Sequence, residues 1–308
     1  MSTQNAISRT EPGSPGAVKA VSVISTGTVQ IRPEHPYGSR KPLYWWLFTS
    51  RQWTPPRPIN VYVIEHASGL VLFDTGQDRA SVTGPGYFPR SGLTGLIYRR
   101  LARFEIAPDQ TLTARLAAIG YDIADVHTAV LSHLHTDHIG GLAELRRADL
   151  VLHQREWDTL GEPRPEARGL LREHIDLPGL RWRPVTPQPV SDPALAPFTA
   201  AHDLFGDGSL VLLPTPGHTP GSLSMLVRQP GATPLLMAGD ATFDVHLMQD
   251  GYLPGLGERA ALRASTRALS TLWARYPDLA ILPAHDPAAG TRLSASSWGQ
   301  RTVAESHR

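Results

Sequence analysis

Residues 133–138, with the sequence HLHTDH, decide the fold that we expect of this chain. They follow an apolar segment that is typical of a strand, and they precede two glycines and a helical segment. Side chains alternate along a strand, so His133 and His135 can point to one side. A tight turn can then present Asp137 and His138 beside them. Three imidazoles and a carboxylate this close together suit borderline divalent ions such as zinc, manganese, iron or cobalt.

Three later segments that read as strands also end in a metal-ligating side chain. These side chains are His218, Asp240 and His285. Each of them alone could merely cap its strand and bond to backbone groups. Because several separate strand ends each offer a ligand, the pattern as a whole favours a metal site.

The composition excludes several classes of protein. The 308 residues include no cysteine, which rules out disulfides, thiolate zinc sites and cysteine nucleophiles. The 29 basic and 28 acidic residues provide no net charge to attract nucleic acid or an anionic membrane. The chain has no apolar run of membrane-spanning length and no apolar region of a secretory signal near its first residue. We therefore expect a soluble, cytoplasmic protein that binds neither nucleic acid nor membrane.

The pattern along the chain predicts an α/β protein in which strands and helices interleave. We expect a disordered tail over residues 1–17 and a single domain over residues 18–308, because no segment has the composition of a flexible linker. The expected strands cover residues 18–25, 59–65, 70–73, 129–132, 149–153, 209–213, 222–227, 235–238 and 280–282, and the clearest expected helices cover 111–119, 141–147 and 259–276. Residues 31–58 and 77–108 are expected to be long loops, and the segment after residue 288 is expected to be loosely attached.

Five segments of the sequence resemble the metallo-β-lactamase fold superfamily of dinuclear metallohydrolases, and the N-terminal half is similar to the N-acyl homoserine lactonases in particular. The segments are INVYVIEHASGLVLFDTG (59–76), LSHLHTDHIGGL (131–142), TPGHTPGSLSMLV (215–227), LLMAGDATF (235–243) and LPAHDP (282–287). Together they extend over most of the chain. The fold that this resemblance implies is a four-layer αββα sandwich with metals at one edge of two packed sheets.

The resemblance also implies the role of each ligand. One metal ion would be held by His133, His135 and His218, the other by Asp137, His138 and His285, and Asp240 would bridge the two. Asp74 would orient the site from behind the ligands, although an aspartate of this kind can also simply form a turn. The implied reaction is attack of a metal-bridging hydroxide on a lactone carbonyl, with Asp240 or Asp137 passing a proton to the leaving oxygen.

One position departs from the lactonase pattern. Where the lactonases have a tyrosine that donates a hydrogen bond to the substrate, three residues after the bridging aspartate, this chain has Phe243. Tyr252 and His246 are candidates to replace that donor, and the alternative is that the substrate differs. The remaining histidines, including His35, are expected to be surface or hydrogen-bonded structural residues.

Aromatic residues in the two expected loops could line a pocket for an acyl chain. They are Trp45, Trp46 and Phe48 in the first loop and Tyr87 and Phe88 in the second, and they could join Phe243, His246 and Tyr252 around the substrate. The alternatives for the first loop are a homodimer contact or a cover over the core. The basic amphipathic stretch at residues 96–104 is interpreted as a solvated helix face.

The leading expectation is a quorum-quenching lactonase with two divalent metal ions, zinc before manganese, iron or cobalt, that opens N-acyl homoserine lactones. The first alternative is a hydrolase on the same scaffold that acts on other lactones, aryl esters or organophosphate triesters. A true β-lactamase and a thioesterase of the glyoxalase II kind are less well supported, the latter because only a short segment follows His285. A non-catalytic binding module with a structural metal is disfavoured, since structural zinc sites are usually closed and four-coordinate.

Overall fold

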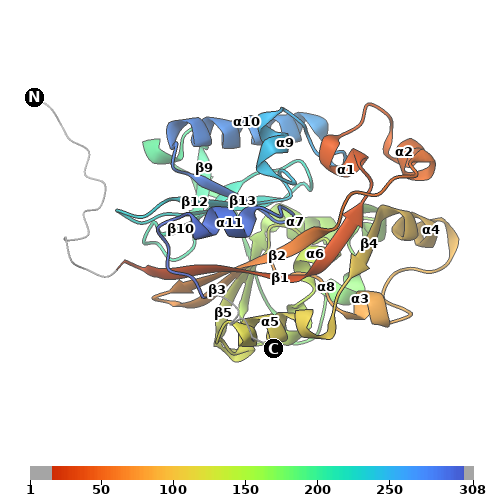
Figure 1. Ribbon diagram of the computed structural model, residues 1–308, viewed down its shortest axis with the longest axis horizontal. Coiled ribbons are helices and arrows are strands. Elements are labelled where there is room, and N and C mark those ends of the chain that lie inside the picture. Colours follow the sequence, from red (N-terminus) through yellow and green to blue (C-terminus); the bar gives the residue numbers. More distant parts are fainter. Residues whose placement is uncertain (1–15, 302–308) are drawn as a thin grey trace, which may run out of the picture.

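A computed structural model describes residues 16–301 of this protein. Two β-sheets pack face to face, and helices cover both outer faces (Figure 1). This is the four-layer αββα sandwich that the resemblance to the metallo-β-lactamase superfamily implies. The tail expected over residues 1–17 falls almost wholly outside the described residues.

The first sheet has seven strands in the order β4-β1-β2-β3-β5-β6-β7. The strands are β1 (Val18–Ile31), β2 (Arg57–His66), β3 (Gly69–Phe73), β4 (Ala102–Glu105), β5 (Val126–Val130), β6 (Asp149–His153) and β7 (Arg181–Val185). β1 pairs antiparallel with β2 and β4, and β2 pairs antiparallel with β3, whereas β3, β5, β6 and β7 run parallel. The carboxyl ends of the parallel strands therefore meet at one edge, where β5 leads into the HLHTDH segment.

The second sheet has six strands in the order β13-β12-β11-β10-β9-β8. They are β8 (Gln188–Pro189), β9 (Ala200–Asp203), β10 (Leu210–Pro214), β11 (Leu223–Val227), β12 (Leu235–Gly239) and β13 (Ala280–Pro283). β12 and β13 are parallel neighbours. Because their carboxyl ends lie side by side, Asp240 and His285, which follow them closely, are placed together.

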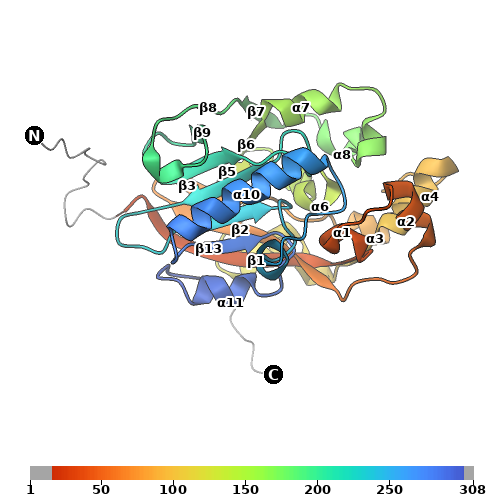
Figure 2. The same cartoon turned by 90° about the horizontal axis from the view of Figure 1, so that it is seen from above.

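Helices α1 to α4 gather at one end of the sandwich, and other helices, α5 and α10 among them, cover its faces (Figures 1 and 2). The helices are α1 (Glu34–Tyr37), α2 (Leu43–Thr49), α3 (Ala80–Thr83), α4 (Gly92–Leu101), α5 (Leu112–Ala118), α6 (Thr136–Ile139), α7 (Gln154–Leu160), α8 (Arg172–Ile175), α9 (Val245–Gln249), α10 (Arg259–Arg275) and α11 (Ala289–Ser294). In Figure 2, α10 lies along the second sheet and α1 to α4 lie together at the opposite end from the N-terminus. Glu258 begins α10 by accepting hydrogen bonds from the amides of Ala260 and Ala261.

The apolar core has one layer between the sheets and one under the helices on each outer face. Phe73 and Met225 meet between the sheets, Leu116 of α5 packs on the first sheet, and Leu269 of α10 packs on the second. All four side chains are fully buried. Burial of each side chain of this size stabilises the fold by about 1.5–3 kcal/mol, which fixes the sheets that carry the site.

The helix expected over residues 141–147 is wrong: only a 3-10 turn, Leu142–Glu144, forms there. The amide of Gly140 donates to the carbonyl of Gly76, and the amide of Gly141 donates to Thr75 Oγ1. Because neither amide bonds to a carbonyl four residues earlier, α6 ends at Ile139. The short helix α6 lies inside the HLHTDH segment instead.

Two other expectations are corrected by the structure. The expected long loops at residues 31–58 and 77–108 contain the helices α1 to α4 and the strand β4. The described part of the segment after residue 288, up to residue 301, is anchored rather than loose, because Ala289 and Leu293 of α11 have no exposed surface. These two residues are one helical turn apart, so they enter the core between the sheets on one face of α11.

Among the residues that the structure describes, no helix combines the length and the apolar character that crossing a bilayer requires.

Candidate metal centre

The predicted metal ligands come together at the edge where strands of both sheets end. The HLHTDH segment follows β5, His218 follows β10, Asp240 follows β12 and His285 follows β13. All the imidazoles of this set except that of His135 are buried, as is the carboxylate of Asp240. The fold thus brings together residues that are more than 150 positions apart in the sequence.

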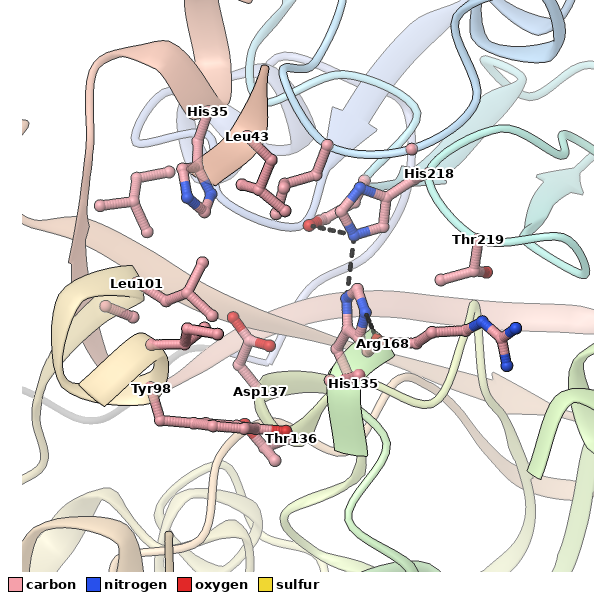
Figure 3. Close-up of a pocket in the computed structure, with 18 of the residues that line it drawn as sticks. His35, Leu43, Tyr98, Leu101, His135, Thr136, Asp137, Arg168, His218 and Thr219 are labelled. Atoms are coloured by element: carbon pink, nitrogen blue, oxygen red, sulfur yellow. Dashed lines mark hydrogen bonds and ion pairs between the residues drawn. The ribbon is translucent and has the colours of Figure 1, made fainter. Parts of the chain in front are cut away.

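Three imidazoles form a first group. The Nε2 atoms of His133 and His218 each lie 3.0 Å from Nδ1 of His135 (Figure 3). Asp137, His138 and His285 form a second group. His138 Nε2 lies 3.8 Å from Asp137 Oδ1, and His285 Nε2 lies 3.5 Å from Asp137 Oδ2.

The carboxylate of Asp240 lies between the two groups. Its Oδ2 atom is 3.6 Å from His218 Nε2. Its Oδ1 atom is 3.5 Å from His138 Nε2 and 3.4 Å from His285 Nε2. One oxygen therefore faces each group, which is the placement that a bridging ligand needs.

These separations fit divalent ions in the site. Donor atoms about 2.0–2.1 Å from a tetrahedral zinc ion are about 3.3 Å apart, close to the nitrogen–nitrogen and nitrogen–oxygen distances found here. His138 Nε2 and Asp240 Oδ1 are buried atoms that have no hydrogen-bond partner among the described residues. Buried polar atoms rarely lack a partner, so these atoms point to an absent ligand. Nitrogen and oxygen donors without sulfur suit zinc and its neighbours in the first transition row.

Hydrogen bonds to the second nitrogen of three rings fix which nitrogen faces the site. His138 Nδ1 lies 2.8 Å from Asp74 Oδ2, His285 Nδ1 donates to the carbonyl of Pro58, and His135 Nε2 donates to the carbonyl of Arg168. When an ion is bound, each ring can therefore direct the lone pair of its other nitrogen at the cluster.

Asp74 connects the ligand segment to the first sheet. Besides His138, its carboxylate accepts hydrogen bonds from the amide and the hydroxyl of Ser132, at 2.7 and 2.9 Å. Its φ of 62° is unusual for a residue other than glycine and costs about 1–3 kcal/mol. The strained backbone aims a carboxylate at the back of a ligand, as the sequence analysis expects of a residue that orients the site.

Burial and neighbouring charges set the protonation of the cluster. Burial lowers the pKa of His218 to about 3, and burial together with the neighbouring imidazoles lowers the pKa of His133 well below its usual value. Burial also opposes a charge on His138, but the carboxylates of Asp74 and Asp240 outweigh it and raise the pKa of that ring well above its usual value. The pKa of Asp240 is lowered, because the His285 and His138 charges outweigh burial. An ion that binds at His138 must therefore displace a proton.

The sequence analysis missed two buried charged side chains that hold the ligand segments. Glu156 of α7 accepts hydrogen bonds from the amides of Leu134 and Gly221, at 3.1 and 3.0 Å. Arg57 pairs with Asp244 at 3.1 Å and also donates to the carbonyl of His285. The sequence gives no local signal for these roles, because the partners are far away along the chain.

A cavity of about 890 Å³ opens onto the cluster. Its apolar wall comes from β1, α2, α4 and β4, and it includes Val29, Ile31, Leu43, Leu101 and Phe104 together with Phe88 and Phe243. Its polar end is formed by His135, Asp137, His218, Asp240 and His285. Figure 3 shows Leu43 and Leu101 bordering the same space as Asp137 and His218. The cavity can therefore hold an apolar chain beside a polar reacting group.

The predicted pocket residues divide into two sets. Phe88 and Phe243 line the cavity, and the Phe243 ring stacks on His285 with 5.6 Å between ring centroids. The others do not line it. They are Trp45, Trp46, Phe48, Tyr87, His246 and Tyr252. Trp45 is 60% exposed, His246 is exposed on α9, and Tyr252 packs edge-on against Tyr37 at the surface.

His35 of α1 lines the cavity, although the sequence analysis places it outside the site. Its side chain is buried and packs edge-on against Trp46, with 5.0 Å between ring centroids. Nε2 of His35 has no hydrogen-bond partner among the described residues. Trp46 therefore supports a lining residue instead of contacting a substrate itself.

The burial of His35 predicts a pH dependence of stability. Burial lowers the pKa of His35 to about 3. The charges of His135 and Arg32 lower this pKa further, whereas the carboxylates of Asp240 and Asp137 raise it. Between this pKa and the pKa of about 6.5 in the unfolded chain, His35 is protonated in the unfolded chain but neutral in the folded one. The free energy of unfolding therefore falls as the pH falls through that range, by up to about 1.4 kcal/mol per pH unit. Urea unfolding in chelator at pH 5 and pH 7 should show a smaller loss for His35→Leu than for the wild type. If His35→Leu and the wild type lose the same free energy of unfolding between pH 7 and pH 5, the buried imidazole of His35 is not the neutral group inferred here.

The fold and the site together define an αββα protein with a cluster of histidines and aspartates for divalent metal ions at the edge of its sheets. Residues 54–285 match the model of the family described as the metallo-beta-lactamase superfamily, and the chain belongs to that superfamily. It is a metal-dependent hydrolase.

The chain is similar to proteins described as lactonases. It is 31% identical to the N-acyl homoserine lactonase AttM of Rhizobium radiobacter over 235 residues, which cover 75% of this chain and 83% of the relative. A crystal structure of a B. thuringiensis AiiA mutant with N-decanoyl-L-homoserine bound at the active site superposes with a TM-score of 0.69 and 20% identity, over 88% of this chain and 94% of that one. AidC, described as a dizinc quorum-quenching lactonase, superposes with a TM-score of 0.59 and 16% identity, over 94% and 95% of the two chains.

Proposed function

We propose that this enzyme opens the lactone ring of N-acyl homoserine lactones with two zinc ions held by the histidines and aspartates of the cluster. The observation that carries the proposal is the apolar cavity that ends at Asp137, His218 and Asp240. An acyl chain in its apolar part would leave the lactone ring at the cluster. The similarity to the AttM lactonase supports this substrate class.

The proposed reaction adds water across the ring ester. The ions, when bound, would supply hydroxide near neutral pH and polarise the carbonyl. The water oxygen bonds to the carbonyl carbon, the bond from that carbon to the ring oxygen breaks, and the ring oxygen receives a proton to give N-acyl homoserine. Asp240 and Asp137 border the cavity at its polar end, so either carboxylate can carry that proton. Asp74 keeps His138 in place through the reaction.

Proton release tests this proposal, because the carboxylic acid of the product is ionised at neutral pH and gives up its proton. A pH indicator should report acidification when zinc-loaded protein meets acyl homoserine lactones, and protein stripped with chelator is the blank. Each added methylene of the acyl chain should raise kcat/KM by up to about fourfold until the cavity is filled, since burying one methylene is worth about 0.8 kcal/mol. Parallel reconstitution with manganese, cobalt or iron identifies the preferred metal. Fully metallated protein that opens none of the lactones would overturn the proposal.

Phe243 motivates a second candidate on the same site. This side chain cannot donate a hydrogen bond, so a substrate that requires no donor at that position would fit as well. The candidate substrates are other lactones, aryl esters and organophosphate triesters. A panel at equal concentration separates the candidates, since the leading proposal requires the highest kcat/KM for an N-acyl homoserine lactone.

A further inference from the structure

Outside the metal cluster, two side chains that line the cavity have a buried polar atom without a hydrogen-bond partner among the described residues, Ser81 Oγ and His35 Nε2. Of these two, His35 has its ring across the cavity from Asp137 and His218 (Figure 3). The Tyr98 hydroxyl donates to the carbonyl of Glu166, and Thr136 accepts from Gln77. Both groups line the cavity, but each of them already has a hydrogen-bond partner. His35 lines the same cavity with a buried Nε2 that has no partner among the residues 16–301. A buried imidazole nitrogen without a partner is costly, which indicates that a ligand completes it.

His35 lies where the apolar part of the cavity meets its polar end. Figure 3 shows its ring beside Leu43 on one wall, with Asp137 and His218 across the space. The carboxylates of Asp240 and Asp137 are close enough to be the strongest charges acting on the ring. Trp46 packs on its edge, so the ring is held in position before any ligand arrives.

An N-acyl homoserine lactone has a polar group at the same junction. Its amide joins the acyl chain to the lactone ring. If the acyl chain lies in the apolar part of the cavity and the lactone ring lies at the cluster, the amide lies between them. We propose that His35 recognises this amide by donating a hydrogen bond from its ring to the amide carbonyl oxygen. This inference rests on the proposed function and explains the substrate specificity of the same site. His35 selects lactones that have the amide over lactones with a plain alkyl chain.

The test compares two substrates in each variant. The first is N-decanoyl homoserine lactone, and the second is a γ-alkyl lactone of similar chain length without the amide. His35→Leu should lower kcat/KM for the first by about tenfold, the usual worth of one hydrogen bond, and leave the second unchanged. A role in packing alone would lower both. His35→Gln, which keeps a side-chain N–H donor, should retain part of the preference for the amide.

Binding of the product gives a readout that does not depend on turnover. Calorimetry with N-decanoyl homoserine should show about tenfold weaker binding to zinc-loaded His35→Leu than to the wild type, with equal zinc content by atomic spectroscopy. His127→Leu is the matched control, because that histidine is exposed and only donates to the carbonyl of Asp125. Its substrate preference should equal that of the wild type.

Each outcome separates the inference from the proposed function. If the wild type opens N-acyl homoserine lactones and His35→Leu keeps the full preference for them, the inference is overturned and the proposed function stands. Loss of the preference in His246→Leu or Tyr252→Phe instead would also overturn it, since those side chains lie outside the cavity. If the wild type opens no N-acyl homoserine lactone, both are overturned.

Discussion

Zinc-loaded protein with Asp240 replaced by alanine is expected to open lactones on the order of a thousandfold more slowly than the wild type. The carboxylate faces His218 with one oxygen and His138 and His285 with the other, at 3.4–3.6 Å. Its removal leaves the two ligand groups without a shared anion between them. The initial rate of proton release under saturating zinc measures the loss.

The zinc content of the variant decides how the loss arises. Two ligand groups remain complete without Asp240. They are His133, His135 and His218, and Asp137, His138 and His285. We therefore expect Asp240→Ala to bind zinc more weakly but not to lose it entirely when zinc is in excess. Asp250→Ala is the matched control, because Asp250 is exposed at the end of α9. Wild-type turnover in Asp240→Ala at full zinc content would contradict the bridging role.

The clustering of the candidate metal ligands could be predicted from the sequence because each follows a strand with a clear apolar pattern. β5, β12 and β13 are short, buried runs, and their ends bring the residues after them to one edge of the sheets, whereas the distant contacts that orient the rings have no signal in the sequence. The resemblance to the metallo-β-lactamase superfamily then implied the layer arrangement. The role expected of Asp74 came from the same resemblance, because an aspartate directly after a strand can equally be a turn residue.

The cavity could not be predicted in the same way, because its walls come from short helices without periodic patterns. α1 and α3 have four residues each, too few to show an apolar repeat. Trp45 and Trp46 are adjacent in the sequence, yet one is 60% exposed and the other 1%. His35 lies between two prolines in the sequence, and only the packing of α1 in the fold shows that its ring contacts Trp46 and lines the cavity.

The contribution of Glu156 to stability could not be predicted from the sequence either. Its replacement by leucine should lower the free energy of unfolding by about 2–6 kcal/mol. The variant leaves the amides of Leu134 and Gly221 buried without an acceptor, at about 1–3 kcal/mol for each. Glu156→Gln should lose about half as much, because its amide oxygen can still accept from one of them. Urea unfolding in chelator measures both losses without any contribution from bound metal.

Glu156 also joins two segments that carry ligands, so its loss should reach the metal site. Leu134 lies between His133 and His135, and Gly221 lies three residues after His218. Once the carboxylate no longer fixes these segments against each other, zinc affinity should fall by about ten- to a hundredfold, as it does when the supports of metal ligands are removed. Asp158→Asn, on an exposed position of the same helix, should change stability by less than about 0.5 kcal/mol. If Glu156→Leu weakens the fold but leaves zinc affinity unchanged, the imidazoles of His133, His135 and His218 are held in place by their own strands, and the carboxylate stabilises only the loops.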